Sequence, residues 1–137
     1  MYMKIIIVLL IAFNLHAHTF PTKADPVKTP GDFCTETNPD FKELRYKEKI
    51  AVCNRNVTTS KRNKVYDNYG IVVSERINYT IDHFIPLFLG GSNDIKNLWP
   101  QHKDISSSML EGKVYNIIAN DKLNRQDSLD LILSIKK

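Results

Sequence analysis

Apolar residues fall on odd positions along the middle of the chain, from Ile71 to Leu87, with polar residues between many of them. A period of two is typical of a β-strand with one buried face. A turn-forming cluster follows at Gly90–Asn93, and the segment from Ile95 to Trp99 predicts a short return strand. We expect Pro100 to end that strand. The pattern therefore predicts a hairpin, with Trp99 in the core.

Helices are predicted on the N-terminal side of this hairpin. Asn38 followed by Pro39 is typical of a helix start, and we expect this helix to run to about Ala51. A second, short helix is predicted over Ser60–Asn68, with Gly70 as its C-terminal stop.

Two more helices are predicted after the hairpin. Apolar residues recur at spacings of one to four from Ile105 to Ile118, which is typical of an amphipathic helix. Asn124 and Asp127 are typical of the cap and first turn of a last helix. The order strand, loop, strand, helix, with flanking helices, predicts an α+β domain.

The first seventeen residues are typical of a secretory signal peptide. A lone Lys4 precedes an apolar run from Ile5 to Phe13, and the small residue Ala17 marks an expected cleavage site. The apolar run is shorter than the ~20 residues that span a bilayer. We expect residues 1–17 to direct the chain to the periplasm or outside the cell, residues 18–33 to form a flexible leader, and residues 34–137 to form one folded domain.

Both cysteines, Cys34 and Cys53, lie in the part of the chain that is expected to be exported. In an oxidising compartment an even pair is usually bridged. Closing a loop of this size contributes about 3 kcal/mol. A zinc site is disfavoured because no histidine lies near either cysteine.

The chain is mildly basic, with a formal net charge of +4 that falls to +3 when Lys4 leaves with the signal peptide. A modest positive charge suits a polyanionic partner, although a solvated helix face is an equally simple explanation of a basic cluster. The candidate phosphate contacts are Lys61, Arg62, Lys64, Arg76 and Lys103.

One segment, from Tyr79 to Lys103, points to a particular chemistry. It joins the pair Asp82-His83 to Asn97 through a glycine-bearing loop. This arrangement resembles the core of the HNH (ββα-metal) endonucleases, and the WPQH run after Asn97 is similar to that of small exported bacterial HNH proteins. The resemblance implies a ββα-metal core that hydrolyses the phosphodiester bonds of DNA, or of RNA, with one divalent metal. Mg²⁺ is the simplest choice, with Mn²⁺ or Zn²⁺ as alternatives.

The resemblance also implies a role for each residue of the motif. His83 is the general base, Asp82 binds the metal, and Asn97 either holds the site together or joins the metal shell. The third histidine of many family members would fall at Ile105 or Ser106 here, which leaves His102 as an alternative third ligand or phosphate contact.

Two expectations follow for the histidine segment. An ordinary imidazole pKa of ~6.5 predicts a rate that falls below that pH. Asp82 and His83 would face opposite sides of a regular strand, so the strand must end or bulge there.

Glu111 matches an acidic position of the similar exported proteins and is a candidate partner for a base that supports the motif.

Two alternatives to a nuclease stay open. The chain is either a catalytically weak nucleic-acid-binding protein or a secreted effector in which the Asp-His-Asn set is structural. If it is a nuclease, its small size predicts little sequence preference. We expect a monomer that has no contact with membranes once the signal peptide is removed.

Overall fold

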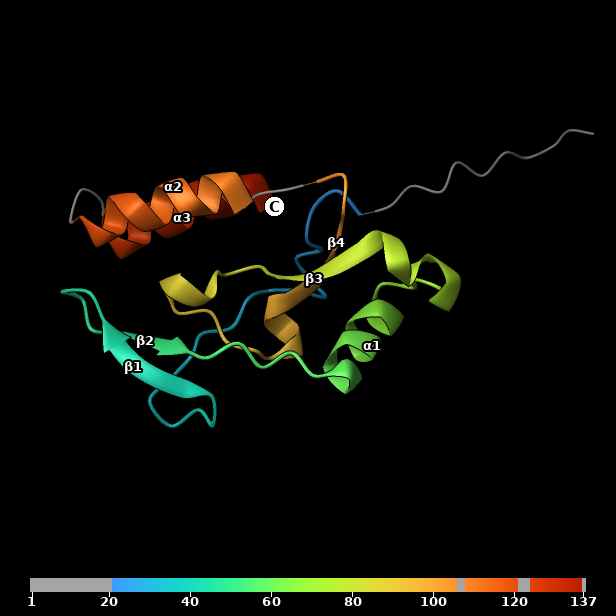
Figure 1. The fold of residues 1–137 in the computed structure, drawn as a ribbon, viewed down its shortest axis with the longest axis horizontal. Coiled ribbons are helices and arrows are strands. Elements are labelled where there is room, and N and C mark those ends of the chain that lie inside the picture. The colour runs from blue at the N-terminus through green and yellow to red at the C-terminus, as the bar shows by residue number, and fades with distance from the viewer. Residues whose placement is uncertain (1–20, 106–107, 121–123, 137) are drawn as a thin grey trace, which may run out of the picture.

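The fold is α+β, as the sequence pattern predicted, and contains two antiparallel hairpins and three α-helices within the described residues (Figure 1). The computed structural model describes residues 21–105, 108–120 and 124–136, so the expected signal peptide lies outside them. The elements in chain order are β1 (Phe41–Arg45), β2 (Ile50–Cys53), α1 (Thr59–Asn68), η1 (Val73–Asn78), β3 (Tyr79–His83), η2 (Leu87–Leu89), η3 (Ile95–Asn97), β4 (Leu98–His102), α2 (Ser108–Ala119) and α3 (Arg125–Lys136), where η denotes a 3₁₀ helix.

The central hairpin pairs β3 with β4, and its register runs from Tyr79 opposite His102 to His83 opposite Leu98. The return strand was predicted over 95–99, but residues 95–97 form η3 and the strand begins at Leu98. The stop predicted at Pro100 is wrong, because this residue lies within β4, opposite Ile81. Hydrogen bonds alternate along an antiparallel pair, and those at the two ends of the hairpin put Pro100 at a position whose nitrogen faces away from β3.

The helix predicted from Asn38 to about Ala51 is not formed. This segment is the β1–β2 hairpin instead, with Arg45 opposite Ile50. The Asn38 side-chain oxygen accepts a hydrogen bond from the Asp40 nitrogen at 3.0 Å, which closes a local turn rather than a helix start. Ile50 is buried, whereas the middle of β1 is exposed, so the hairpin is fixed by burial of β2.

The other helix predictions are confirmed. Helix α1 begins one residue before the predicted range, and the left-handed Gly70 (φ 69°) follows its end. In α3, the Asn124 side-chain oxygen accepts a hydrogen bond from the Asp127 nitrogen at 2.9 Å, as expected for a helix cap.

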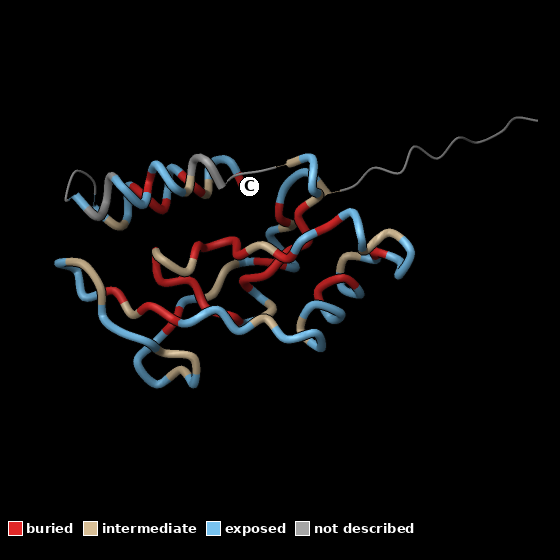
Figure 2. The backbone as a smooth tube through the Cα atoms, viewed as in Figure 1, coloured by how far each residue is buried: buried red, intermediate tan, exposed pale blue. Residues whose placement is uncertain are grey.

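Two hydrophobic clusters hold the β3–β4 hairpin from opposite sides (Figures 1 and 2). On one side, Trp99 packs with Val114 of α2 and Ile132 of α3. On the other side, Leu98 packs with Val65 of α1. Successive residues of β4 thus serve different clusters, as the alternation of side chains along a strand requires.

The segment 21–33, which was predicted to be a flexible leader, packs along the folded unit. The Ala24 nitrogen donates to the Lys136 carbonyl at 2.9 Å, and the fully buried Thr29 hydroxyl donates to the Leu98 carbonyl at 3.1 Å. A proline-rich segment without hydrophobic period can still be ordered by such backbone bonds. The leader prediction is therefore wrong for these residues.

The predicted bridge between Cys34 and Cys53 is present, and it links the end of this N-terminal segment to β2. A disulfide is consistent with an extracellular or periplasmic location. Among the described residues, no helix combines the length and apolar character needed to cross a bilayer.

We predict that Cys34→Ser, Cys53→Ser and the double variant each lower the free energy of unfolding by about 3 kcal/mol, because the bridge restricts the unfolded chain. Urea titration of oxidised and reduced wild-type protein should show the same difference. Two reactive thiols in the native, oxidised protein would contradict the bridge.

Candidate functional site

The side chain of Asn97 ties together the two segments that follow β3. Its Oδ1 accepts a hydrogen bond from the Ile85 nitrogen at 2.8 Å, while its Nδ2 donates to the Ile85 carbonyl at 3.0 Å and to the Ser92 carbonyl at 2.9 Å. The residue is fully buried. Asn97 thus joins the segment after β3 to the glycine loop, and its amide oxygen is engaged by the Ile85 nitrogen.

Two glycines make this close approach feasible. A Cβ on Gly91 would lie 1.9 Å from the Ile85 carbonyl oxygen and 2.8 Å from Nδ2 of Asn97, so no larger residue fits without moving the backbone. The preceding Gly90 ends η2 in the left-handed region, with φ of 90°. The glycine pair of the sequence motif is thus explained by the packing around Asn97.

His83 ends β3 and is 2% exposed. Its Nε2 lies 3.0 Å from Oδ1 of Asn93. The orientation of that amide follows from its other bonds, because Nδ2 of Asn93 faces two acceptors, an Asp40 carboxylate oxygen at 3.0 Å and the Asn54 carbonyl at 2.7 Å. Oδ1 is therefore an acceptor, Nε2 of neutral His83 carries the hydrogen, and Nδ1 carries the lone pair.

The Nδ1 atom of His83 is buried and has no hydrogen-bond partner among the described residues. His83 also lines a pocket of about 320 Å³ between the β1–β2 hairpin, the end of β3 and α2. The charged residues of this pocket are Lys42, Arg45, Arg55, Asp82 and Glu111. A histidine with an unpartnered ring nitrogen among the described residues thus belongs to the lining of a strongly charged pocket.

Burial lowers the pKa of His83 from its ordinary 6.5 to about 4. The hydrogen bond with Asn93 and the charge of Asp82 oppose this shift, while the positive charges of Arg55 and Lys136 add to it. The ring is neutral at pH 7, so it can accept a proton there. An ordinary pKa of ~6.5 was expected for His83 from the sequence. The lower pKa of about 4 replaces that expectation.

Asp82 lies on the opposite face of β3, opposite Trp99. Its Oδ2 accepts hydrogen bonds from Trp99 Nε1 at 3.2 Å and from Lys136 Nζ at 2.9 Å. Both Asp82 and His83 nevertheless line the pocket, and β3 ends at His83. From the sequence, the strand was expected either to end or to bulge at Asp82 and His83, and the strand ends there.

Lys136 is a functional candidate that sequence reasoning missed. Its buried ammonium donates to the His83 carbonyl at 2.6 Å and forms an ion pair with Glu111 as well as with Asp82. Glu111 thus pairs with a base next to the motif, as its position suggested. Nothing in the local sequence around Lys136 distinguishes it from the other lysines, because α3 brings it to Asp82 from far along the chain.

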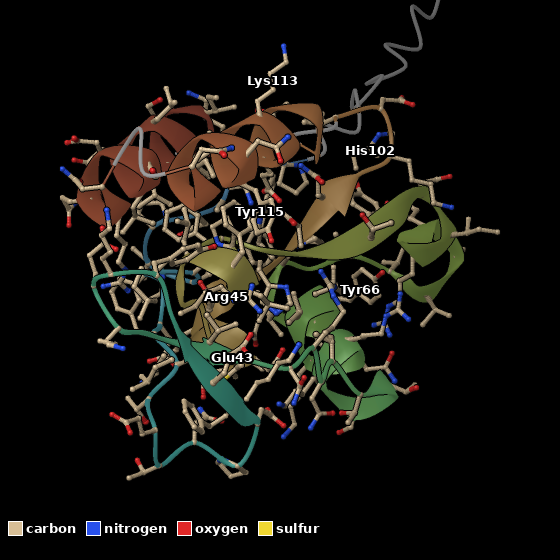
Figure 3. The ribbon with its side chains drawn as sticks, turned by 60° about the vertical axis from the view of Figure 1, so that its left-hand side comes forward. Glu43, Arg45, Tyr66, His102, Lys113 and Tyr115 are labelled. Carbon is tan, nitrogen blue, oxygen red and sulfur yellow. A yellow bond between two sulfur atoms is a disulfide. The ribbon has the colours of Figure 1, made fainter. Side chains whose placement is uncertain are left out.

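The fold does not place His102 near Asp82. It lies opposite Tyr79, three residues along β3 from Asp82, which corresponds to about 10 Å. Its Nδ1 is 3.4 Å from an Asp104 carboxylate oxygen, and Figure 3 shows it at the far end of β4. Within the described ranges, no three His, Cys, Asp or Glu side chains are grouped to hold a metal ion. The donor set Asp82, Asn97 and His102 therefore does not come together.

The predicted basic residues lie away from this pocket. Lys61 and Lys64 of α1 line a different pocket that includes three aspartates, and Arg62 lines a third with Arg55. Lys103 follows the far end of β4 and is exposed.

Arg76 has a structural role. Its guanidinium pairs with Asp67, donates to Asn63 Oδ1 at 3.1 Å and lies over the Tyr66 ring. It therefore joins η1 to α1 rather than offering a free charge to a phosphate.

The basic residues that do line the pocket are Lys42, Arg45 and Arg55. Lys42 and Arg45 were missed because their segment was expected to be a helix, whereas Arg55 lies after that segment and was not among the candidate phosphate contacts. Figure 3 shows Arg45 between β1 and the layer formed by α2 and α3. The short apolar run of β2 could have indicated a strand in place of the helix. This strand ends two residues before Arg55.

Comparisons with protein-family models, with curated proteins and with solved structures find no match to this chain.

We predict that protein stability falls between pH 6.5 and pH 4 because of His83. In this range the unfolded chain binds a proton at His83, while the folded chain, with its pKa of about 4, does not. The loss amounts to roughly 3 kcal/mol across the range. Urea titrations at several pH values should show a smaller acid loss for His83→Gln than for wild type. Equal losses in the two proteins would contradict the lowered pKa.

Proposed function

We propose that this chain is an exported phosphodiesterase that cleaves DNA, with RNA as an alternative substrate, and that it resembles the HNH endonucleases. The observation that carries the proposal is His83, a residue with an unpartnered Nδ1 among the described residues, in the lining of a pocket that also bears Arg45 and Arg55. Guanidinium groups bind phosphate oxygens well, and a neutral imidazole accepts a proton from water. The two features together suit a phosphodiester bond.

The order of elements supports the same proposal. The β3–β4 hairpin is followed by α2, which is the order strand, strand, helix of a ββα-metal core. The Asp82-His83 pair ends the first strand of this unit, and Asn97 immediately precedes the second. We propose that these elements correspond to the HNH core.

The residues of this chain then act as follows. Nδ1 of His83 takes a proton from a water molecule while the water oxygen bonds to phosphorus. The bond from phosphorus to the leaving sugar oxygen breaks, and that oxygen takes a proton from water in the pocket. Arg55, together with Arg45, which also pairs with Glu43, offsets the charge that develops on the phosphate oxygens. His83 finally returns its proton to solvent.

The divalent metal implied by the resemblance does not fit the oxygen and nitrogen atoms that were expected to bind it. The Asn97 oxygen is used by the backbone, His102 is remote, and Asp82 already faces the Lys136 ammonium. The proposed reaction is therefore assigned to side chains alone.

Low sequence preference follows from the size of the domain. The pocket contacts proposed here are to phosphate, which carries no sequence information. We propose a nuclease that binds through its basic residues and is strongly sensitive to salt.

We predict that His83→Ala lowers the cleavage rate of plasmid DNA roughly 10²–10⁴-fold and leaves DNA binding nearly unchanged, because a neutral imidazole adds no charge. For wild type, kcat/KM should stay level from pH 7 to about pH 5 and fall only toward pH 4, following the His83 pKa. The measurement is plasmid nicking across this pH range. Full activity of His83→Ala would exclude His83 as the base, and binding without cleavage by wild type would favour the binding-protein alternative.

We predict that Arg45→Gln/Arg55→Gln weakens DNA binding more than Lys61→Gln/Lys64→Gln, a matched pair on α1 that removes the same charge. If both arginines contact phosphate on duplex DNA, the slope of log affinity against log salt should decrease in magnitude by about 2. Fluorescence anisotropy at several salt concentrations measures this slope. A larger change in the α1 pair would locate the phosphate contacts at Lys61 and Lys64, as the sequence first suggested.

A further inference from the structure

The ammonium of Lys136 is surrounded by three oxygen atoms next to the proposed base. It donates to the backbone carbonyl of His83 at 2.6 Å, lies 2.9 Å from Oδ2 of Asp82, and pairs with Oε1 of Glu111. The side chain is only 1% exposed. An ammonium has three N–H groups, so its hydrogen-bonding capacity is fully used.

The same three oxygens would suit a hard divalent cation. Carboxylate and carbonyl oxygens are the ligands that Mg²⁺ and Mn²⁺ prefer. Burying a lysine charge is strongly unfavourable unless oxygens of this kind surround it. The ammonium and a divalent ion therefore compete for one position, and the ammonium is covalently attached to the fold.

Helix α3 holds the ammonium in this position. The Lys136 carbonyl accepts a hydrogen bond from the Ala24 nitrogen at 2.9 Å, which fixes the last turn of the helix. Further back along α3, Leu129 and Ile132 pack in the same cluster as Trp99, the residue opposite Asp82. Displacing the ammonium would require this helix end to move.

We propose that Lys136 is the resident cation of the site, occupying the position of a divalent metal ion, and that hydrolysis here needs no divalent metal. The second part rests on the proposed function, whereas the first part does not. Lys136 is a positioning residue, because its buried ammonium holds Asp82 and the His83 backbone rather than reaching into the pocket.

The first test measures Mn²⁺ binding by electron paramagnetic resonance of the free ion. Lys136→Met removes the charge but keeps much of the side-chain volume, so it leaves two carboxylates without a counter-charge. We expect this variant to bind one Mn²⁺ at least tenfold more tightly than wild type does. Lys136→Met/Glu111→Gln should lose that gain. Lys113→Met, which removes an exposed lysine from α2 (Figure 3), is the matched control and should bind Mn²⁺ as wild type does.

A second comparison does not depend on whether Lys136→Met folds. Mn²⁺ binding by wild type and by Glu111→Gln should be equal, since Glu111 is occupied by Lys136 in both the presence and the absence of metal. Weaker Mn²⁺ binding in Glu111→Gln than in wild type would overturn the proposal, as would equal binding by wild type and a folded Lys136→Met variant.

The activity test uses plasmid cleavage with EDTA or with Mg²⁺. We expect wild type to cleave at the same rate in both, and Lys136→Met to be active only with Mg²⁺. Wild-type cleavage that is abolished by EDTA and restored by Mg²⁺ would overturn metal independence. If wild type cleaves under neither condition, the proposed function fails, while the Mn²⁺ measurements still decide whether Lys136 occupies the cation position.

Discussion

The buried Asn97 side chain accepts one hydrogen bond and donates two, and together these bonds keep Ile85 and Ser92 at a fixed separation inside the protein. The glycine loop can close only around this amide, and closure places Asn93 beside His83. Asn93 in turn determines which imidazole nitrogen carries the hydrogen. The tautomer of the neutral candidate base thus depends, through two side-chain amides, on one buried asparagine.

Charge burial is the second constraint on this region. The ammonium of Lys136 and the imidazole of His83 are both buried, yet one is fully paired and the other keeps an unused nitrogen. A fold tolerates a buried cation when oxygens saturate it. An unpaired nitrogen is costly and brings no structural gain, which is why such atoms concentrate at sites of chemistry. The paired Lys136 therefore suits a structural role, whereas the unpaired nitrogen of His83 suits a chemical one.

Local signals were sufficient for much of the fold. Helices α1 and α3 carry their own caps and stops, and the Asp82-His83 pair lies where strand periodicity placed it. Asn38 misled because an asparagine before a proline starts turns as readily as helices. The choice between them was made by burial of Ile50, together with a disulfide to Cys34, and neither effect is visible in the local pattern.

The site was predictable only where its residues are close in sequence. Spacing could not show that His102 lies at the wrong end of the hairpin, or that Arg76 is used to join η1 to α1. Lys136 and Arg45 reach the pocket region through tertiary packing alone. These residues contribute charge, which has no periodicity along a chain and therefore leaves no sequence signal of its own.

The hydrogen bond between Ala24 and Lys136 joins a segment that is synthesised early to one that is synthesised late. Synthesis proceeds from the N-terminus, and domains begin to fold while the chain is still emerging. The motif from Asp82 to Asn97 therefore appears well before the helix that supplies Lys136. Until that helix docks, Asp82 and Glu111 lack their shared counter-charge and the N-terminal segment lacks its anchor. The site therefore cannot be complete before α3 has docked.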